Sequence, residues 1–488
     1  MFRIKQLIKM LLQNILLPLL YKCYARRPVE TGLVLFADAH HSEMPVSMSR
    51  MYEAVRTLED FSLHKDGQSD AGGLCRSSNE QSDARQLCGS SNGQSDARQL
   101  CRSSNGQPDH FAVGQDEEKS RNMPDIQVET FITDFDRLSF FAMAKYLVLF
   151  MRRYAVAEYV FICDYFLPVS SCRKRPETKV TQLWHACGML KKIAYEAKDD
   201  IPKGYHGNMF GNYTYMTVSA DACIAPHERA MRLAPGRTFA TGISRTDFYF
   251  DEAWNAKCRE HFYAQHPEAQ GRKIILWAPT FRGNAAHPSL TGLDEVQRAA
   301  SRREKEAYLI IKAHPHIDRH AKVSNCEIPT EELLPVADLL ITDYSSIMFD
   351  WLLYRKPMIL YTPDLPEYEA ARGFFMDFRS IPFPIVQTEE ELVRAMEEMD
   401  IRAETYTNGA HDARLVKDGR AALRDGSEKI RTDSQTEKKK EDMPVRNWMD
   451  AHAAEISQFA NTCVGACDGH ATERILQLVG LGLEADNR

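Results

Sequence analysis

The sequence predicts an α/β protein built from two doubly wound domains that face each other across a cleft. Short apolar runs typical of buried strands alternate with helix-like stretches, and this rhythm starts again after about residue 270. Near-continuous apolar strands separated by helices indicate parallel sheets that are covered on both faces. The length of 488 residues is also sufficient for two or three domains with large hydrophobic cores.

Eight apolar runs are predicted to form the strands of the two sheets. They are residues 32–39, 128–133, 158–164 and 179–186 in the first half of the chain, and residues 273–280, 307–314, 338–343 and 357–362 in the second half. In open parallel sheets, ligands bind outside the carboxyl ends of the strands. We therefore expect the functional residues directly after these strands.

The composition excludes several classes of protein. Hydrophobic residues make up 44% and charged residues 26% of the chain, which is close to the average for globular proteins. The formal net charge of -7 lacks the overall basic field of nucleic-acid binders, so we expect no nucleic-acid partner. The 12 cysteines follow neither a disulfide framework nor a zinc-ligand spacing, which indicates a reduced, intracellular protein without structural zinc.

Residues 1–27 are rich in Leu and Ile and form the predicted membrane-associating segment. The longest stretch without a charge, Met10 to Tyr21, is shorter than the roughly twenty apolar residues that a spanning helix needs. Lys5, Lys9 and Gln13 recur every four residues and place a polar stripe on one side of a helix. This pattern favours an interfacial helix on anionic lipid, hence peripheral attachment at the cytoplasmic side of the cell membrane. A secretory signal lacks its cleavage site here, and a helix packed on the protein itself is the other alternative.

Two polar blocks interrupt the predicted domains. Residues 68–106 hold three related copies of a Ser-, Asn-, Gln- and Gly-rich repeat, which buries too little apolar surface to offset the loss of chain entropy. Residues 405–442 have no apolar periodicity. We interpret both as inserted, disordered segments, the first in an N-terminal domain of residues 28–250 and the second in a C-terminal domain of residues 251–488.

The first candidate site motif is TQLWHACGMLKKIAYE, residues 181–196. A strand is predicted to bring Trp184 and His185 to its carboxyl end, and a turn of small residues then opens a helix with Lys191 and Lys192. A histidine can take a proton from a hydroxyl near neutral pH, because its unperturbed pKa is about 6.5. The alternative is a buried histidine that satisfies a turn carbonyl, and this motif alone does not separate the two.

The second motif is ADLLITDYSSIMFDWLLYRKPMILY, residues 337–361. A strand and the turn Asp343–Ser346 lead into a predicted amphipathic helix that carries Asp350. At a helix N-terminus, Ser345 and Ser346 offer hydroxyls, backbone N–H groups and the positive end of the helix dipole to a phosphate. Ordinary N-capping is the alternative.

Three shorter motifs follow other predicted strands and carry cationic side chains. TGISRTD, WAPTFRG and IIKAHPHI contribute Arg245, then Thr280 and Arg282, then Lys312, His314 and His316. Arginine and lysine pair with phosphate oxygens, so together these residues predict a cationic lining for a diphosphate. A Walker loop, a GxGxxG fingerprint, a nucleophile elbow and an HExxH motif are all missing from the sequence, and we expect neither a cofactor nor a metal ion.

At these same motifs, the sequence resembles the CDP-glycerol glycerophosphotransferase family of bacterial teichoic acid primases and polymerases. The resemblance extends in order over about residues 179–378, with a weaker tail in DGHATER at 468–474. WHACGMLKK is similar to the family's WHG[TA]xxxK block, TGISRTD to TGxxRND, WAPTFRG to YAPTWRD and IIKAHPH to xxRxHP. The segment from ITDYSSIMFDW to GFFMDF follows the family signature almost throughout.

The resemblance implies a GT-B fold with two Rossmann-like domains, the first on the acceptor side and the second holding most of the nucleotide donor. It implies transfer of glycerol phosphate, or a related polyol phosphate, from CDP-glycerol to a hydroxyl of a lipid-linked anionic cell-wall polymer, with release of CMP. His185 and His314 match the two important histidines of the family, and we expect them to be catalytic. The positions expected to bind substrate are Trp184, Ala186, Cys187, Gly188, Arg245, Pro279, Thr280, Arg282, Lys312, Ala313, Ser345, Ser346 and Asp350.

Several departures from the family pattern leave the donor open between CDP-glycerol and another CDP-polyol. Ala186, Cys187 and Gly188 stand where Gly-Thr-Pro is commoner, and Lys312 stands where arginine is usual. Two alternatives belong to other classes. One is a GT-B glycosyltransferase that uses a nucleotide sugar for capsule or wall polysaccharide, and the other is a non-catalytic membrane-bound module that recognises anionic polymer.

Overall fold

The computed structural model describes residues 11–65, 125–197, 200–201, 207–284, 287–314, 317–318, 321–399 and 448–482. The two predicted insertions, residues 68–106 and 405–442, lie outside this set, so their predicted disorder stays a prediction. Within the described residues, none of the helices combines the length and the apolar composition that crossing a membrane requires.

Six parallel strands form the sheet of the first domain, in the order β2-β1-β3-β4-β5-β6. Their bounds are β1 Glu30–Asp38, β2 Gln127–Ile132, β3 Ala157–Ile162, β4 Lys179–Gln182, β5 Tyr215–Thr217 and β6 Thr238–Phe239. The four strands predicted for this half are confirmed, although β4 ends four residues before the predicted residue 186. β5 and β6 were not predicted, because runs of three and two residues carry no readable pattern.

Five parallel strands form the sheet of the second domain, in the order β10-β7-β11-β12-β13. Their bounds are β7 Lys273–Ala278, β10 Ala307–Ile311, β11 Leu339–Thr342, β12 Met358–Tyr361 and β13 Ile385–Val386. All four strands predicted for this half are confirmed. A small antiparallel hairpin, β8 Arg282–Asn284 with β9 His287–Ser289, follows β7.

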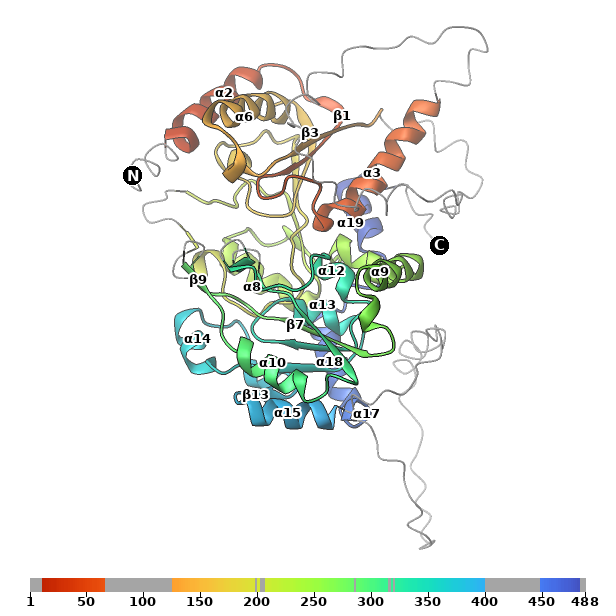
Figure 1. The fold of residues 1–488 in the computed structure, drawn as a ribbon. Coiled ribbons are helices and arrows are strands. Elements are labelled where there is room, and N and C mark those ends of the chain that lie inside the picture. Colours follow the sequence, from red (N-terminus) through yellow and green to blue (C-terminus); the bar gives the residue numbers. More distant parts are fainter. Residues whose placement is uncertain are drawn as a thin grey trace, which may run out of the picture.

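Helices cover both faces of each sheet, as the doubly wound prediction requires (Figure 1). In the first domain, α2 and α6 pack on one face while α3 and α19 pack on the other. In the second domain, α9, α13 and α18 cover one face, and α10 and α15 cover the other. The helices are α2 Leu17–Tyr24, α3 Val46–Lys65, α6 Phe140–Tyr154, α7 Leu167–Ser170, α8 Ile224–Met231, α9 Glu252–Gln265, α10 Leu293–Ser301, α12 Thr330–Leu333, α13 Ile347–Leu352, α14 Leu365–Ala371, α15 Glu389–Glu398, α17 Trp448–Ala451, α18 Ala453–Val464 and α19 Ala471–Val479.

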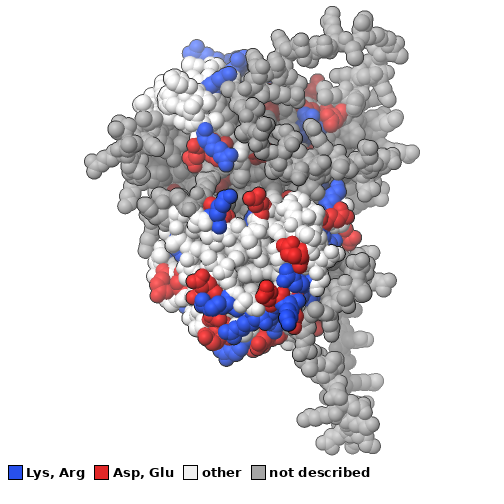
Figure 2. Space-filling model, in the orientation of Figure 1, with Lys and Arg blue, Asp and Glu red and all other residues white. Residues whose placement is uncertain are grey.

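The N-terminal helix, which consists of a turn at Leu12–Leu16 and α2 directly after it, packs on the protein through the side that we predicted to be polar. Gln13, Leu17 and Tyr21 are buried, and α2 packs against α6, where the ring of Tyr21 lies 5.1 Å from that of Tyr154. The prediction that Gln13 belongs to an exposed polar stripe is therefore wrong, because its spacing of four residues from Leu17 puts it on the packed side. The opposite side is apolar and exposed, and Figure 2 shows this end of the molecule, at the top, as an uncharged area bordered by basic side chains.

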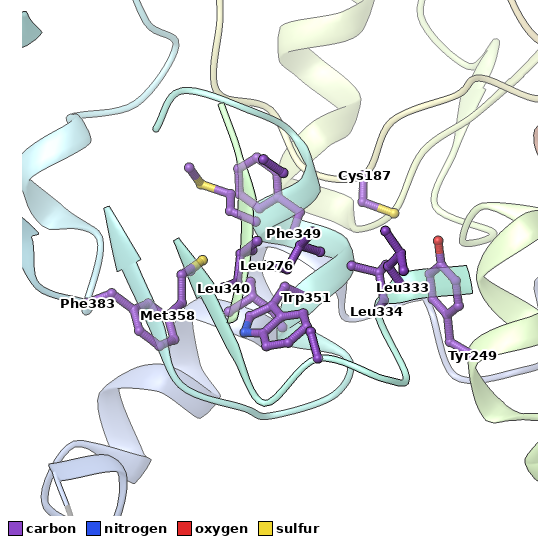
Figure 3. Packing of buried hydrophobic residues seen from close by; sticks show 14 of the residues in the cluster. Cys187, Tyr249, Leu276, Leu333, Leu334, Leu340, Phe349, Trp351, Met358 and Phe383 are labelled. Atoms are coloured by element: carbon purple, nitrogen blue, oxygen red, sulfur yellow. The ribbon is translucent and has the colours of Figure 1, made fainter. Parts of the chain in front are cut away.

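A shared apolar cluster joins the two domains. Cys187 from the first domain and Tyr249 from the connecting segment belong to the same buried cluster as Leu276, Leu333 and Phe349 of the second (Figure 3). Burial of such side chains is the main favourable term in association between protein surfaces. The two sheets are thus held with their carboxyl edges toward one cleft.

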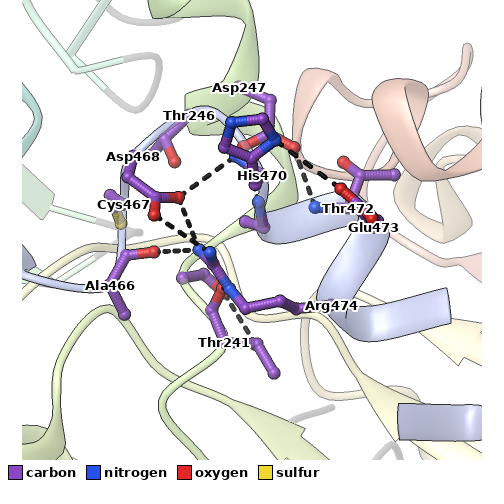
Figure 4. Close-up of polar contacts among 12 residues, drawn as sticks. Thr241, Thr246, Asp247, Ala466, Cys467, Asp468, His470, Thr472, Glu473 and Arg474 are labelled. Atoms are coloured by element: carbon purple, nitrogen blue, oxygen red, sulfur yellow. Dashed lines mark hydrogen bonds and ion pairs between the residues drawn. The ribbon is translucent and has the colours of Figure 1, made fainter. Parts of the chain in front are cut away.

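The chain crosses between the domains twice. The short helix Ser244–Phe250 leads from the first domain to the second, and after α18 the chain returns, so that α19 packs on the first sheet. The carboxylate of Asp247 accepts hydrogen bonds from the backbone N–H groups of Ala471 and Thr472, at 3.0 and 2.8 Å (Figure 4). The TGISRTD and DGHATER motifs therefore lie side by side. The predicted boundaries of the two domains stay a prediction, and α19, from the predicted C-terminal domain, packs on the core of the first domain.

We expect Asp247→Ala to destabilise the protein by about 1–2 kcal/mol, because it removes a buried cap from the N-terminus of α19. The loss should appear in thermal denaturation as a melting temperature several degrees below that of the wild type. Asp251→Ala is the matched control, since Asp251 caps the more exposed start of α9. Equal melting of Asp247→Ala and the wild type would contradict the structural role of this cap.

Candidate active site

Two adjoining cavities lie where the carboxyl edges of the sheets face each other. The larger, of about 450 Å³, is lined mainly by first-domain residues that follow β3 and β4. The smaller, of about 190 Å³, is lined mainly by second-domain residues that follow β7, β10 and β11. His185 and Ser346 line both cavities, so these two residues mark the border between them.

His185 is held by an unusual turn at the end of β4. Trp184 adopts a left-handed φ of 59°, a conformation that is rare and strained for an aromatic residue. The side-chain oxygen of Gln182 accepts the Trp184 backbone N–H at 3.0 Å, and this bond stabilises the turn. The φ reversal ends the strand early and turns His185 into the cleft, where 44% of its side chain is exposed.

The hydrogen bonds of His185 leave one ring nitrogen available. Nδ1 lies 3.2 Å from the carbonyl oxygen of Cys163, so in the neutral ring Nδ1–H donates and Nε2 keeps a lone pair. The carboxylate of Asp164 is 3.8 Å from Nδ1, which is too far for a hydrogen bond. His185 therefore fits both alternatives given for it, because Nδ1–H bonds to a carbonyl while Nε2 can accept a proton.

The smaller cavity brings together most of the predicted site residues. The predicted residues that line it are His185, Arg245, Pro279, Lys312, Ala313, His314, Ser345, Ser346 and Asp350. They come from both domains and from five separate motifs. His316 lies outside the described residues.

The ion pair of Arg245 and Asp350 lies buried in the wall of the smaller cavity. Their charged atoms are 2.8 Å apart, and Glu331 stands 3.8 Å from the same guanidinium. Burial raises the pKa of Asp350 above its ordinary value, although the positive charge of Arg245 opposes this shift. Because its charge is already neutralised, Arg245 is better placed to hold the wall than to supply free charge to a phosphate.

The remaining cationic and hydroxyl groups of the smaller cavity are less committed. The Lys312 ammonium donates one hydrogen bond to the carbonyl of Cys326 at 3.0 Å, and burial lowers the pKa of Lys312. His314 contacts the ring of Phe281 at a centroid distance of 4.7 Å. Ser345 and Ser346 lie at the start of α13, as predicted, but α13 is buried rather than amphipathic because it lies between the sheet and α18.

Arg282 and Thr280 are the predicted residues that line neither cavity. The Arg282 guanidinium forms ion pairs with Asp343 at 2.9 Å and Asp364 at 2.6 Å. The backbone N–H of Thr280 also donates to Asp343, at 2.8 Å. Through these contacts, both residues help to hold the second domain together.

The turn of small residues after His185 lines the larger cavity together with Trp184. Gly188 has a φ of 65°, which proline cannot adopt, and a Cβ atom there would lie 2.3 Å from the ring of Phe349. The close approach of the two domains at this point thus requires glycine. The predicted helix after Gly188 is wrong, because the backbone at Lys191 instead forms an antiparallel bridge with Phe374 of the second domain.

Several residues that line the two cavities were not among the predicted site residues. Asp164 and Lys191 line the larger cavity, and Tyr249 and Glu331 line the smaller. Asp164 is the last residue of the predicted strand 158–164 and lies beyond the observed end of β3 at Ile162, so the rule that functional residues follow strands could have found it. Tyr249 and Glu331 follow no strand end, and the sequence carries no signal for them.

The comparisons with known proteins agree with this geometry. The model of the CDP-glycerol:poly(glycerophosphate) glycerophosphotransferase family matches residues 122–430, more than half of the chain. The chain belongs to this family. As a member of the CDP-glycerol glycerophosphotransferases it is a transferase of the glycerophosphotransferase type, and membership favours polyol phosphate transfer over a nucleotide-sugar or a non-catalytic function.

Several curated relatives are teichoic acid enzymes. The teichoic acid ribitol-phosphate primase of Bacillus spizizenii is 30% identical over 328 residues, 63% of this chain and 84% of the relative. The teichoic acid poly(ribitol-phosphate) polymerase of the same organism is 32% identical, over 56% of this chain and 46% of the relative. The teichoic acid glycerol-phosphate primase of Bacillus subtilis is 32% identical, over 45% of this chain and 59% of the relative. The chain thus spans most of one relative and about half of the other two.

A solved structure of the wall teichoic acid polymerase TagF has the same fold. It superposes with a TM-score of 0.59 at 14% sequence identity, covering 98% of this chain and 97% of that chain. Together with the two parallel sheets that face one cleft, this likeness confirms the predicted GT-B-like fold.

We expect Asp350→Ala to lower the free energy of unfolding by about 3–5 kcal/mol, because it leaves the Arg245 guanidinium buried without its partner. Urea denaturation of the wild type and the variant measures this loss. The double variant Arg245→Met with Asp350→Leu removes both charges and should recover much of the stability. If Asp350→Ala and the wild type unfold at the same urea midpoint, the ion pair does not stabilise the protein as assigned here.

Proposed function

We propose that the protein transfers a polyol phosphate, glycerol or ribitol phosphate, from a CDP-polyol to a hydroxyl of a lipid-linked anionic polymer and releases CMP. The observation that carries the proposal is the position of His185 on the border of two cavities. One cavity presents lysine, histidine and serine side chains from strand ends of the second domain, as a diphosphate requires. The other is open to a second substrate.

In this mechanism, the acceptor hydroxyl attacks the β-phosphorus of the donor in line with the leaving group. Nε2 of His185 takes the hydroxyl proton, while Nδ1–H stays bonded to the Cys163 carbonyl and keeps the ring oriented. A new P–O bond forms to the acceptor, and the bond from the β-phosphorus to the bridging oxygen breaks. CMP leaves with that oxygen and its electron pair.

The second domain supplies the groups that stabilise the charge on the phosphates. Lys312 and His314 follow β10, and the hydroxyls of Ser345 and Ser346 follow β11, all on one side of the cavity. Fixed donors that face the developing charge stabilise a transition state without reorganising. Arg245 acts through Asp350 as a positioning residue in this scheme.

We expect His185→Ala to lower kcat by about 10²–10⁴-fold, the usual effect of removing a general base. The measurement is CMP release from CDP-glycerol and from CDP-ribitol, with a lipid-linked disaccharide as acceptor. His452→Ala is the control, since His452 lies between α17 and α18 and lines neither cavity. Near-full activity of His185→Ala would show that His185 is not the general base. Turnover of a nucleotide sugar without release of CMP would show that the donor is not a CDP-polyol.

We further propose that the exposed apolar side of the N-terminal helix, together with α6, binds the cytoplasmic face of the cell membrane. Its apolar side chains are each more than a third exposed: Leu11, Ile15, Leu16, Leu19, Phe140, Phe141, Val148 and Leu149. Exposed Lys22, Lys145 and Arg152 border this surface. An apolar patch with a basic rim suits an anionic lipid surface, and it would hold the cleft near a lipid-linked acceptor.

We expect the double variant Leu19→Asp with Phe141→Asp to bind anionic phosphatidylglycerol vesicles about tenfold or more weakly than the wild type, because two apolar side chains no longer enter the bilayer. Cosedimentation with the vesicles measures this binding. Phe250→Asp is the matched control, because Phe250 is exposed but lies in the segment between the domains. Unchanged binding of the double variant would show that this surface does not contact lipid.

A further inference from the structure

The larger cavity has no part in holding the donor phosphates in the mechanism above. It opens on the first-domain side of His185, and its volume of about 450 Å³ lies within the range of small-molecule binding sites. Trp184, Met209, Phe210 and Tyr213 supply apolar and aromatic wall. The cavity is therefore formed well enough to hold a ligand of its own beside the proposed base.

Not every charged side chain that lines this cavity has an ion-pair partner among the described residues. Its charged or titratable lining, tyrosines and Cys187 aside, consists of Asp164, His185, Lys191, Asp200 and Arg372. The Arg372 guanidinium is committed to Asp200 through two parallel hydrogen bonds of 2.8 and 2.9 Å. For the Lys191 ammonium, by contrast, the described part of the chain provides no hydrogen-bond or ion-pair partner.

The backbone fixes Lys191 at this place. On either side of it, the Lys192 N–H donates to Gly373 at 3.1 Å and the Phe375 N–H donates to Leu190 at 2.7 Å. Burial lowers the pKa of Lys191 to about 8, so the amine still holds its proton at pH 7. A positive charge that is partly removed from water and left unpaired is costly, and an anion that enters the cavity relieves this cost.

We propose that the larger cavity is the acceptor site and that Lys191 binds a phosphate of the acceptor, next to the hydroxyl presented to His185. The inference rests on the proposed transferase function and adds the cavity and the side chain that hold the second substrate. Lysine binds phosphate as a point charge, which suits a flexible phosphodiester whose orientation is not fixed by a bidentate contact. Because His185 and Ser346 belong to both cavities, an acceptor held here meets the donor at their border.

The test compares Lys191→Met with Lys192→Met, a neighbouring lysine that lines neither cavity. The probes are a lipid-linked disaccharide that carries one glycerol phosphate unit and the same lipid-linked disaccharide without that unit, called the phosphate-free acceptor below. Lys191→Met should raise KM for the phosphate-bearing acceptor about tenfold or more, because a charge-assisted hydrogen bond is lost. KM for the CDP-polyol and KM for the phosphate-free acceptor should stay within about twofold of the wild type, as should all values for Lys192→Met.

Two results would overturn the inference: a matching rise in KM for both acceptors, or a rise in KM for the CDP-polyol alone. If the wild type releases no CMP with either acceptor, the proposed function fails, and the site is then tested by calorimetric binding of a short glycerol phosphate oligomer. Binding about tenfold weaker in Lys191→Met still supports an anion site, and equal binding overturns it. Should Lys191→Met fail to fold, Lys191→Gln takes its place in the same assays.

Discussion

The buried ion pair between Arg245 and Asp350 is the constraint on which the cleft depends. Arg245 belongs to the segment that connects the domains, and Asp350 to α13, directly after the central strand β11 of the second sheet. Neither charge is tolerated in the interior without the other, so the connecting segment can pack only where the pair forms. This places the end of β4, with His185, opposite the start of α13.

The strands of both sheets could be predicted because their apolar runs are long enough to read. The helix predicted after Gly188 could not have been corrected from the sequence, since the partner of Lys191 is Phe374, almost two hundred residues further along the chain. The prediction for the sides of the N-terminal helix was wrong for a similar reason. Its composition shows an apolar and a polar side, but only the packing on the rest of the first domain decides that the side with Gln13 is the buried one.

The candidate site could be predicted residue by residue wherever a motif follows a strand. His185, Lys312 and Ser346 are brought together from distant segments because the carboxyl ends of parallel strands share an edge. Arg282 shows the limit of this reasoning. Its chemistry suits a phosphate, but Asp343 and Asp364, whose approach depends on the tertiary fold, take up its charge instead.

The double crossing of the chain determines how the domains can move. The outgoing and the returning segments lie together where Asp247 caps α19, and each has a glycine with positive φ beside it, Gly242 at 82° and Gly469 at 90°. Two bodies joined by a single segment can both bend and twist, whereas two adjacent segments act as a double-stranded hinge that resists torsion. Any change in the width of the cleft would therefore turn about both segments at once, and it would have to separate Cys187 from Phe349 in the shared cluster.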